Sequence, residues 1–169
     1  MIRIVMLYLL SSLFLAHAGE SLVVESNGCV MKAKHATGFS FMKTDEGVSF
    51  IKYKYKDGRV ENIKIRCKDM ALESAISSGY VQEKDGLKIG SGSHPLAKAE
   101  RISGENWSGV EATYFLGSVC FTTSFEAGKA HVFSIDVCGE EEDMKELRSS
   151  FLVLLKHANT HYAESDFKQ

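Results

Sequence analysis

The chain has 169 residues, with 20 lysines and arginines against 22 aspartates and glutamates, so its formal net charge is −2. This length is typical of one domain that can bury its own core. The charge lacks the basic excess of most nucleic-acid-binding proteins, so we expect no nucleic acid among its partners.

The first 18 residues have the pattern of a secretory signal peptide. Arg3 precedes an apolar run from residue 4 to residue 16, and Ala16-His17-Ala18 forms an A-x-A cleavage site before Gly19. The run is too short to span a bilayer with ease, so an uncleaved anchor is the less favoured alternative. We therefore expect one exported domain from residue 19 to residue 169, periplasmic or secreted, with no stable membrane anchor.

Four cysteines follow the expected cleavage site: Cys29, Cys67, Cys120 and Cys138. An even number in an exported chain predicts two disulfides, for which three connectivities exist. We favour Cys29 with Cys67 and Cys120 with Cys138, because each pair then lies within one half of the chain. No C-x-x-C spacing indicates a zinc or thioredoxin-type site, so we expect no metal and no other cofactor.

Hairpin signals fill the first half of the chain. Strands are expected at residues 21–26, 29–36, 38–43, 48–55 and 60–67. Asn27-Gly28 predicts a two-residue turn that pairs Ser26 with Cys29. Leu22, Val24, Cys29 and Met31 would then share one face.

The segment 48–67 is the most informative, because it interleaves lysines with tyrosines. A two-residue turn at Asp57-Gly58 would pair Tyr55 with Val60, Lys54 with Glu61 and Phe50 with Ile65. The expected core face carries Val48, Phe50, Ile63, Ile65 and Cys67, and the other face carries Ile51, Tyr53, Tyr55, Asn62, Lys64 and Arg66.

This second face has two interpretations. Charged runs are usually solvated surfaces, whereas tyrosine and arginine are enriched in protein interfaces. Tyr53, Tyr55, Lys64 and Arg66 are therefore candidate partner-binding residues.

The middle of the chain is less regular. Asp69 is expected to cap a short helix from residue 70 to residue 77, with Gly79 as its end. Weak strand patterns follow at 87–89 and 99–102. Between them, a Gly/Ser loop presents Ser91, Ser93 and His94, which are either part of a plain surface loop or partner-binding residues.

Trp107 is a further candidate binding residue, because we expect it to be exposed. It lies in Asn106-Trp107-Ser108, which is a glycosylation acceptor only in a eukaryotic host.

The second half has a clearer pattern. Strands are expected at 110–116, 119–125 and 129–138, followed by a helix whose first residues, 140–143, are acidic. The apolar residues Met144, Leu147, Phe151, Leu154, Leu155 and Ala158 recur at helical spacing and should pack on the sheet. Residues 159–169 are expected to form a frayed tail.

These elements predict an α+β fold: a mostly antiparallel sheet built from hairpins, a short middle helix and a C-terminal amphipathic helix packed on the sheet. The hairpins, the acidic turn and the closing helix ending in SSFLVLL resemble the end of PsbP-like periplasmic domains. The resemblance covers about a third of the chain and includes no specific motif, so it implies no residue roles.

No catalytic motif is present. His157 and His161 form H-x-x-x-H without the glutamate of a zincin, which favours a solvated helix end. We therefore expect an exported, non-enzymatic binding protein, an inhibitor or immunity protein that blocks a partner enzyme or toxin. Two alternatives stay open: a PsbP-like domain that binds a small ligand or serves as an envelope accessory, and a hydrolase with a dispersed site.

Overall fold

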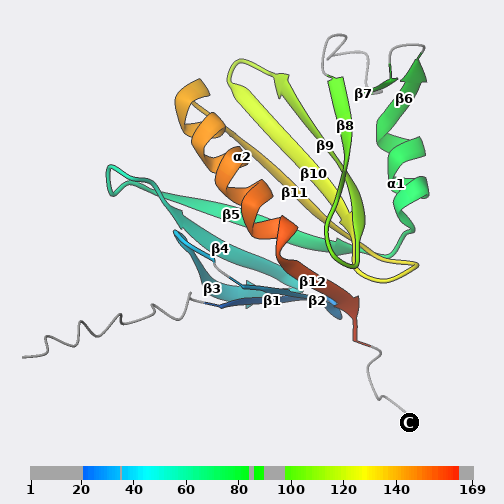
Figure 1. The fold of residues 1–169 in the computed structure, drawn as a ribbon, viewed down its shortest axis with the longest axis horizontal. Coiled ribbons are helices and arrows are strands. Elements are labelled where there is room, and N and C mark those ends of the chain that lie inside the picture. Colours follow the sequence, from blue (N-terminus) through cyan, green and yellow to red (C-terminus); the bar gives the residue numbers. More distant parts are fainter. Residues whose placement is uncertain (1–20, 35, 84–85, 90–97, 164–169) are drawn as a thin grey trace, which may run out of the picture.

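The computed structural model describes residues 21–34, 36–83, 86–89 and 98–163, and the predicted signal peptide lies outside them. The chain forms an α+β fold dominated by antiparallel strands, as predicted (Figure 1). The strands are β1 (Leu22–Ser26), β2 (Cys29–Ala33), β3 (Phe39–Asp45), β4 (Val48–Lys54), β5 (Val60–Lys68), β6 (Tyr80–Glu83), β7 (Gly86–Ile89), β8 (Lys98–Ser103), β9 (Ser108–Phe115), β10 (Val119–Glu126), β11 (Val132–Gly139) and β12 (Ala158–Tyr162). The helices are α1 (Leu72–Gly79) and α2 (Glu141–Lys156).

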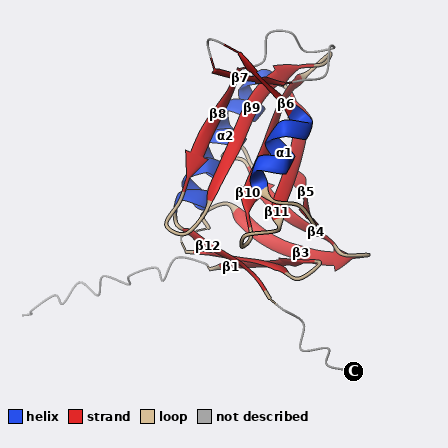
Figure 2. Cartoon of the chain, turned by 90° about the vertical axis from the view of Figure 1, so that its right-hand side faces the viewer, coloured by secondary structure: helices blue, strands red, loops and turns tan. Residues whose placement is uncertain are grey.

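The strands form two sheets. The large sheet has the order β3-β4-β5-β11-β10-β9-β8-β7-β6, and the small sheet has the order β1-β2-β12. The two helices lie on opposite faces of the large sheet (Figure 2). We call the face that packs against α2 and the small sheet the inner face, and the face beneath α1 the outer face.

The main core lies between the inner face and α2. Phe121, Phe125 and Phe133 point into it from the sheet, and the exposed fraction of each is at most 1%. Five residues of the predicted stripe lie on α2 and meet them: Met144, Leu147, Phe151, Leu154 and Leu155 are all buried. The sixth, Ala158, is also buried but belongs to β12, because α2 ends at Lys156. Three carboxylates in the first turn of α2 complement the helix dipole, as expected from the sequence.

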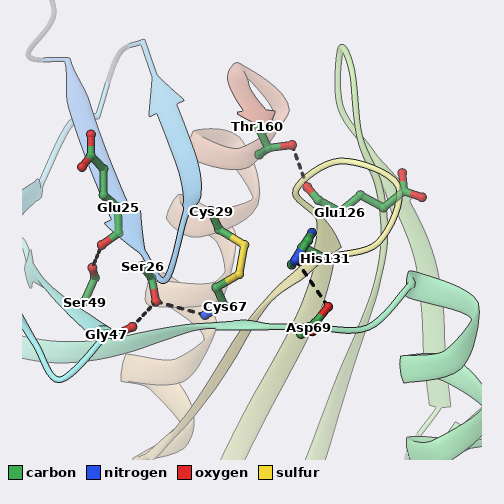
Figure 3. Close-up of a disulfide and its surroundings, with 10 residues drawn as sticks. All are labelled: Glu25, Ser26, Cys29, Gly47, Ser49, Cys67, Asp69, Glu126, His131 and Thr160. Carbon is green, nitrogen blue, oxygen red and sulfur yellow. Dashed lines mark hydrogen bonds and ion pairs between the residues drawn. A yellow bond between two sulfur atoms is a disulfide. The ribbon is translucent and has the colours of Figure 1, made fainter. Parts of the chain in front are cut away.

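The first hairpin and the disulfides match the prediction. Ser26 pairs with Cys29 across the Asn27-Gly28 turn, whose two residues both have positive φ, as a type I′ turn requires. The disulfides join Cys29 to Cys67 and Cys120 to Cys138. The first of them ties the small sheet to β5 (Figure 3). The Ser26 hydroxyl lies beside it, donating to the Gly47 carbonyl and accepting from the Cys67 N–H.

The register of β4 and β5 differs from the prediction by one residue. Lys54, not Tyr55, lies opposite Val60, and Phe50 lies opposite Lys64. The expected Lys54–Glu61 pair is therefore absent from this ladder, because Tyr53 lies opposite Glu61.

The turn between these strands explains the shift. The Gly58 N–H donates to the Tyr55 carbonyl at 3.0 Å, and the Tyr55 N–H donates to the Arg59 carbonyl at 2.9 Å. With φ of 91° at Gly58, this is a three-residue loop that ends in a left-handed glycine. One extra loop residue moves every side chain of β4 to the opposite face. Phe50 therefore points outward and Tyr53 points into the core, contrary to the prediction.

Helix α1 begins later than predicted. Its N-cap is Ala71, without a side-chain cap, so Asp69 does not cap it; the Asp69 carboxylate instead lies 3.4 Å from His131 Nε2. The helix extends through Gly79, two residues beyond the predicted end at residue 77, and the predicted stop residue is its last residue.

The start of the expected frayed tail is a strand. Residues 158–162 form β12, which pairs with β2 so that Ala158 lies opposite Ala33. The Asn106 amide donates to the Thr160 carbonyl and accepts from the Thr160 N–H. The Trp107 indole donates to the Ala158 carbonyl at 3.2 Å. Trp107 is only 4% exposed, so its predicted place on the surface is wrong.

Candidate functional site

The outer face of β3, β4 and β5 carries a concentration of basic side chains. Because side chains alternate along a strand, the buried Ile51, Tyr53, Ile63 and Ile65 leave their neighbours pointing outward. We define the basic sheet surface as Phe50 together with the six exposed cations Lys43, Lys52, Lys54, Lys64, Arg66 and Lys68. The chain as a whole is slightly acidic, so this surface is a local departure from its average charge.

Phe50 lies near the centre of this surface. The Lys43 and Lys64 ammonium groups are 5.6 Å and 5.9 Å from the centroid of its ring, within the range of cation–π contacts. Among the described residues, Lys43 is the one cation of the set that forms an ion pair, with Asp45 at 3.1 Å. The other five charges are uncompensated by a direct partner there, which gives the surface a positive potential.

A polar pocket of ≈ 300 Å³ lies beside this surface, between α1 and the outer face. Its sheet side is formed by Lys68, Thr122, Ser124, Ser134 and Asp136.

The helical side of the pocket is less polar. It consists of Met70, Ala75, Ser78, Gly79 and Tyr80. Tyr114 of β9 completes the lining. The pocket therefore combines a hydroxyl-rich floor with a wall of aromatic and aliphatic groups.

Two tyrosines hold the polar groups of the pocket in place. The Tyr114 hydroxyl donates to Asp136 Oδ1 at 2.9 Å, and the Tyr80 hydroxyl is hydrogen-bonded to Thr122. Burial raises the pKa of Tyr80 to about 12, with a further contribution from the negative charge of Glu111. Burial and the bond to Asp136 raise the pKa of Tyr114 to about 12. Both phenols are therefore protonated at neutral pH.

The strand registers make the pocket and the basic sheet surface continuous. Ser124 of β10 lies opposite Ser134 of β11, and Ser134 lies opposite Arg66 of β5. Lys68, which lines the pocket, lies opposite Val132. A partner on the basic sheet surface would therefore reach the edge of the pocket.

The predicted binding residues that the structure describes do not form one site. Lys64 and Arg66 belong to the basic sheet surface. Tyr53 and Tyr55 are buried on the inner face, where the Tyr53 hydroxyl hydrogen-bonds with Ser150 at 2.8 Å. Both tyrosines are therefore structural, and so is the buried Trp107.

The other predicted binding residues, Ser91, Ser93 and His94, lie outside the described residues. The prediction that His157 and His161 share the terminal helix is wrong. His157 follows the end of α2, and His161 lies in β12. No group of three metal-ligating side chains occurs within the described ranges.

The sequence prediction missed Phe50 and four of the lysines. Their alternation with Ile51, Tyr53, Ile63 and Ile65 was visible in the sequence, but only the correct register places Phe50 and the cations together.

Comparisons with known proteins assign no family. No family model and no curated protein matches the chain. Among solved structures, the chain is similar to that of cyanobacterial PsbP (CyanoP) from Synechocystis sp. PCC 6803, with 12% identity and a TM-score of 0.43 over 90% of this chain and 99% of that one. A likeness at this level supports no conclusion about function.

The disulfides fit an exported protein, because such cross-links persist in oxidising compartments. No helix in the described part of the chain is long and apolar enough to cross a membrane.

Proposed function

We propose that this chain is an exported, non-enzymatic binding protein that recognises an acidic partner protein through the basic sheet surface. The observation that carries the proposal is the set of six exposed cations around Phe50, five of which have no ion-pair partner among the described residues. Such a surface attracts a complementary acidic one and repels a basic one.

The arrangement of the surface matches that of a protein interface. A central aromatic side chain can supply much of the binding energy once it is desolvated, whereas charges at the rim mainly affect the association rate. Phe50 has the central position, and Lys43, Lys52, Lys64 and Arg66 surround it. The rigid sheet beneath them would lose little conformational entropy on binding.

We propose an enzyme or toxin with acidic side chains at its active site as the partner. A sheet surface that covers those side chains would exclude substrate, so binding would inhibit. Under this proposal the protein acts as an inhibitor or immunity protein.

The experiment compares charge variants in capture and in kinetics. Proteins of the native envelope or secretome are captured on the wild type, on Lys52→Glu/Lys64→Glu, and on the matched control Lys32→Glu/Lys156→Glu. The control makes the same charge change on β2 and α2, away from the basic sheet surface. Partners are identified by mass spectrometry, and association rates are measured by surface plasmon resonance at increasing salt.

An acidic partner should be retained by the wild type and the control but lost by Lys52→Glu/Lys64→Glu. Its association rate should fall as salt rises, and Phe50→Ala should mainly increase the dissociation rate. If the partner is an enzyme, titration with the wild type should abolish its activity. Equal binding by both charge variants would refute the proposed surface.

A further inference from the structure

The pocket between α1 and the sheet has a chemistry of its own. We propose that it binds a small, uncharged, polyhydroxylated ligand of the saccharide class. This goes beyond the proposed function, because it assigns a ligand to a cavity that a protein partner need not enter.

The first argument is the number and state of the hydroxyl groups. Six line the pocket, from Ser78, Tyr80, Tyr114, Thr122, Ser124 and Ser134. In the part of the chain that the structure describes, the side-chain hydroxyls of Ser124 and Ser134 have no hydrogen-bond partner. A hydroxyl can donate and accept at once, so these two can pair with the hydroxyls of a sugar in either direction. The hydroxyls of Ser78, Tyr114 and Thr122 already donate within the protein and can serve as acceptors.

The second argument is the arrangement of charge. Asp136 lies four residues along β11 from Val132, and Val132 lies opposite Lys68. At roughly 3.3 Å per residue, the backbone positions of Lys68 and Asp136 are about 13 Å apart along the strand direction. The charged groups of a free amino acid are adjacent and cannot meet both.

A small anion fits no better. It could pair with Lys68 but would gain nothing from the Asp136 carboxylate at the other end of the cavity, which repels negative charge. An uncharged polyol can use both ends, because its hydroxyls donate to Asp136 and accept from Lys68.

The third argument is the aromatic and aliphatic part of the lining. Met70, Ala75 and Tyr80 line the helical side of the pocket, and Tyr114 lines it from β9 of the sheet. Aromatic rings have a negative face, which suits the slightly positive C–H groups of a sugar ring. A volume of ≈ 300 Å³ is at the lower end for ligand pockets and suits one or two sugar units.

The test uses ligand-observed and protein-observed NMR on the full mature chain. The probes are glucose, N-acetylglucosamine and the β-1,4-linked tetramer of each, with inorganic phosphate and glycine as comparators at matched ionic strength. The tetramers distinguish a free sugar from the end of a polysaccharide. We expect saturable binding of at least one saccharide, with shifts confined to the pocket, and no saturable binding of phosphate or glycine.

Three variants locate the binding. Asp136→Asn and Ser124→Ala/Ser134→Ala should each weaken saccharide affinity on the order of five-fold or more, since each removes hydrogen bonds to the ligand. Lys32→Gln, on β2 and away from both the pocket and the basic sheet surface, should leave the saccharide affinity unchanged. Thermal melts establish that each variant is folded, and Asp136→Asn is nearly isosteric.

The proposal is overturned if no saccharide of the panel binds saturably. It is also overturned if both pocket variants bind the saccharide as tightly as the wild type does, or if phosphate or glycine binds more tightly than every saccharide. None of these results bears on the proposed binding of an acidic protein partner, which Lys52→Glu/Lys64→Glu tests. Failure of the two proposals is therefore distinguishable.

Discussion

Removing the Cys29–Cys67 disulfide should destabilise the fold more than removing Cys120–Cys138. A disulfide stabilises mainly by reducing the entropy of the unfolded chain, and the effect grows with the logarithm of the loop it closes. The sequence separations are 38 and 18 residues. The chain-entropy relation then gives about 4 kcal/mol for the first disulfide and about 3 kcal/mol for the second.

The contacts around the two disulfides support the same order. Cys120 and Cys138 lie opposite each other on β10 and β11, which are held together along their whole length by strand pairing. Cys29 and Cys67 lie in different sheets, so their bond is the direct covalent link between β2 and β5. Fewer other interactions compensate for its loss.

The assay is urea unfolding of the wild type and of the two double-alanine variants, followed by circular dichroism. Each protein is measured with and without a reductant, so that the remaining disulfide serves as an internal control. We expect the free energy of unfolding to fall by about 4 kcal/mol in Cys29→Ala/Cys67→Ala and by about 3 kcal/mol in Cys120→Ala/Cys138→Ala. The reverse order, or a loss below about 1 kcal/mol in the first variant, would refute the loop-entropy reasoning.

Three further changes test the core, a turn and an ion pair. Phe151→Ala should cost roughly 3–5 kcal/mol in urea unfolding, because Phe151 is fully buried beside Phe39 and Phe121; wild-type stability would mean that α2 does not pack here. Gly58→Ala should cost about 1–2 kcal/mol, because φ is 91° while the space around the residue is open; an unchanged midpoint would contradict the three-residue loop. Hydrogen bonds from Arg59 lower the pKa of Asp143, so this pair stabilises the fold above pH about 4 and the contribution is lost as the pH falls through the lowered pKa. Melting temperatures of Arg59→Gln and the wild type should therefore converge at low pH, and a constant difference down to pH 2 would argue against this origin.

Elements with strong local signals could be predicted from the sequence. Asn27-Gly28 fixed the first hairpin, because few turns other than type I′ accept positive φ at both residues. The stripe of α2 and its acidic first turn identified the helix and its buried face. The α+β fold follows from such elements and from their order.

Strand β12 could not be predicted in the same way. Its sequence, ANTHY, is short and polar, and its partner β2 lies at the other end of the chain. It is held by contacts between distant residues: Asn106 binds the backbone of Thr160, and the Thr160 hydroxyl donates to the Glu126 carbonyl at 2.6 Å. No local pattern encodes such contacts.

The prediction of the candidate site depended on one feature, the length of the loop around Asp57-Gly58. An Asp-Gly pair suits a two-residue turn and also the end of a three-residue loop, so local preference does not decide between them. The core does: Tyr53 packs on Phe39 with ring centroids 4.7 Å apart and hydrogen-bonds with α2 through Ser150. The shorter loop would put Tyr53 in solvent and the partly exposed Phe50 in the core. Phe50 has no hydroxyl, so it could not replace the hydrogen bond of Tyr53 to α2.

The length of this loop also determines how the positive charge is distributed over the outer face. With the three-residue loop, Phe50 lies opposite Lys64 and beside Lys43, so the aromatic and the cations share one surface. With the two-residue turn, the lysines of β4 would have pointed to the face opposite those of β5, and the charge would have been divided between two sides of the sheet. The burial of Tyr53 favours this register, and the register places the cations on one surface. A Tyr53 substitution that preserves the fold also preserves the register, so it should leave the charge of the basic sheet surface unchanged.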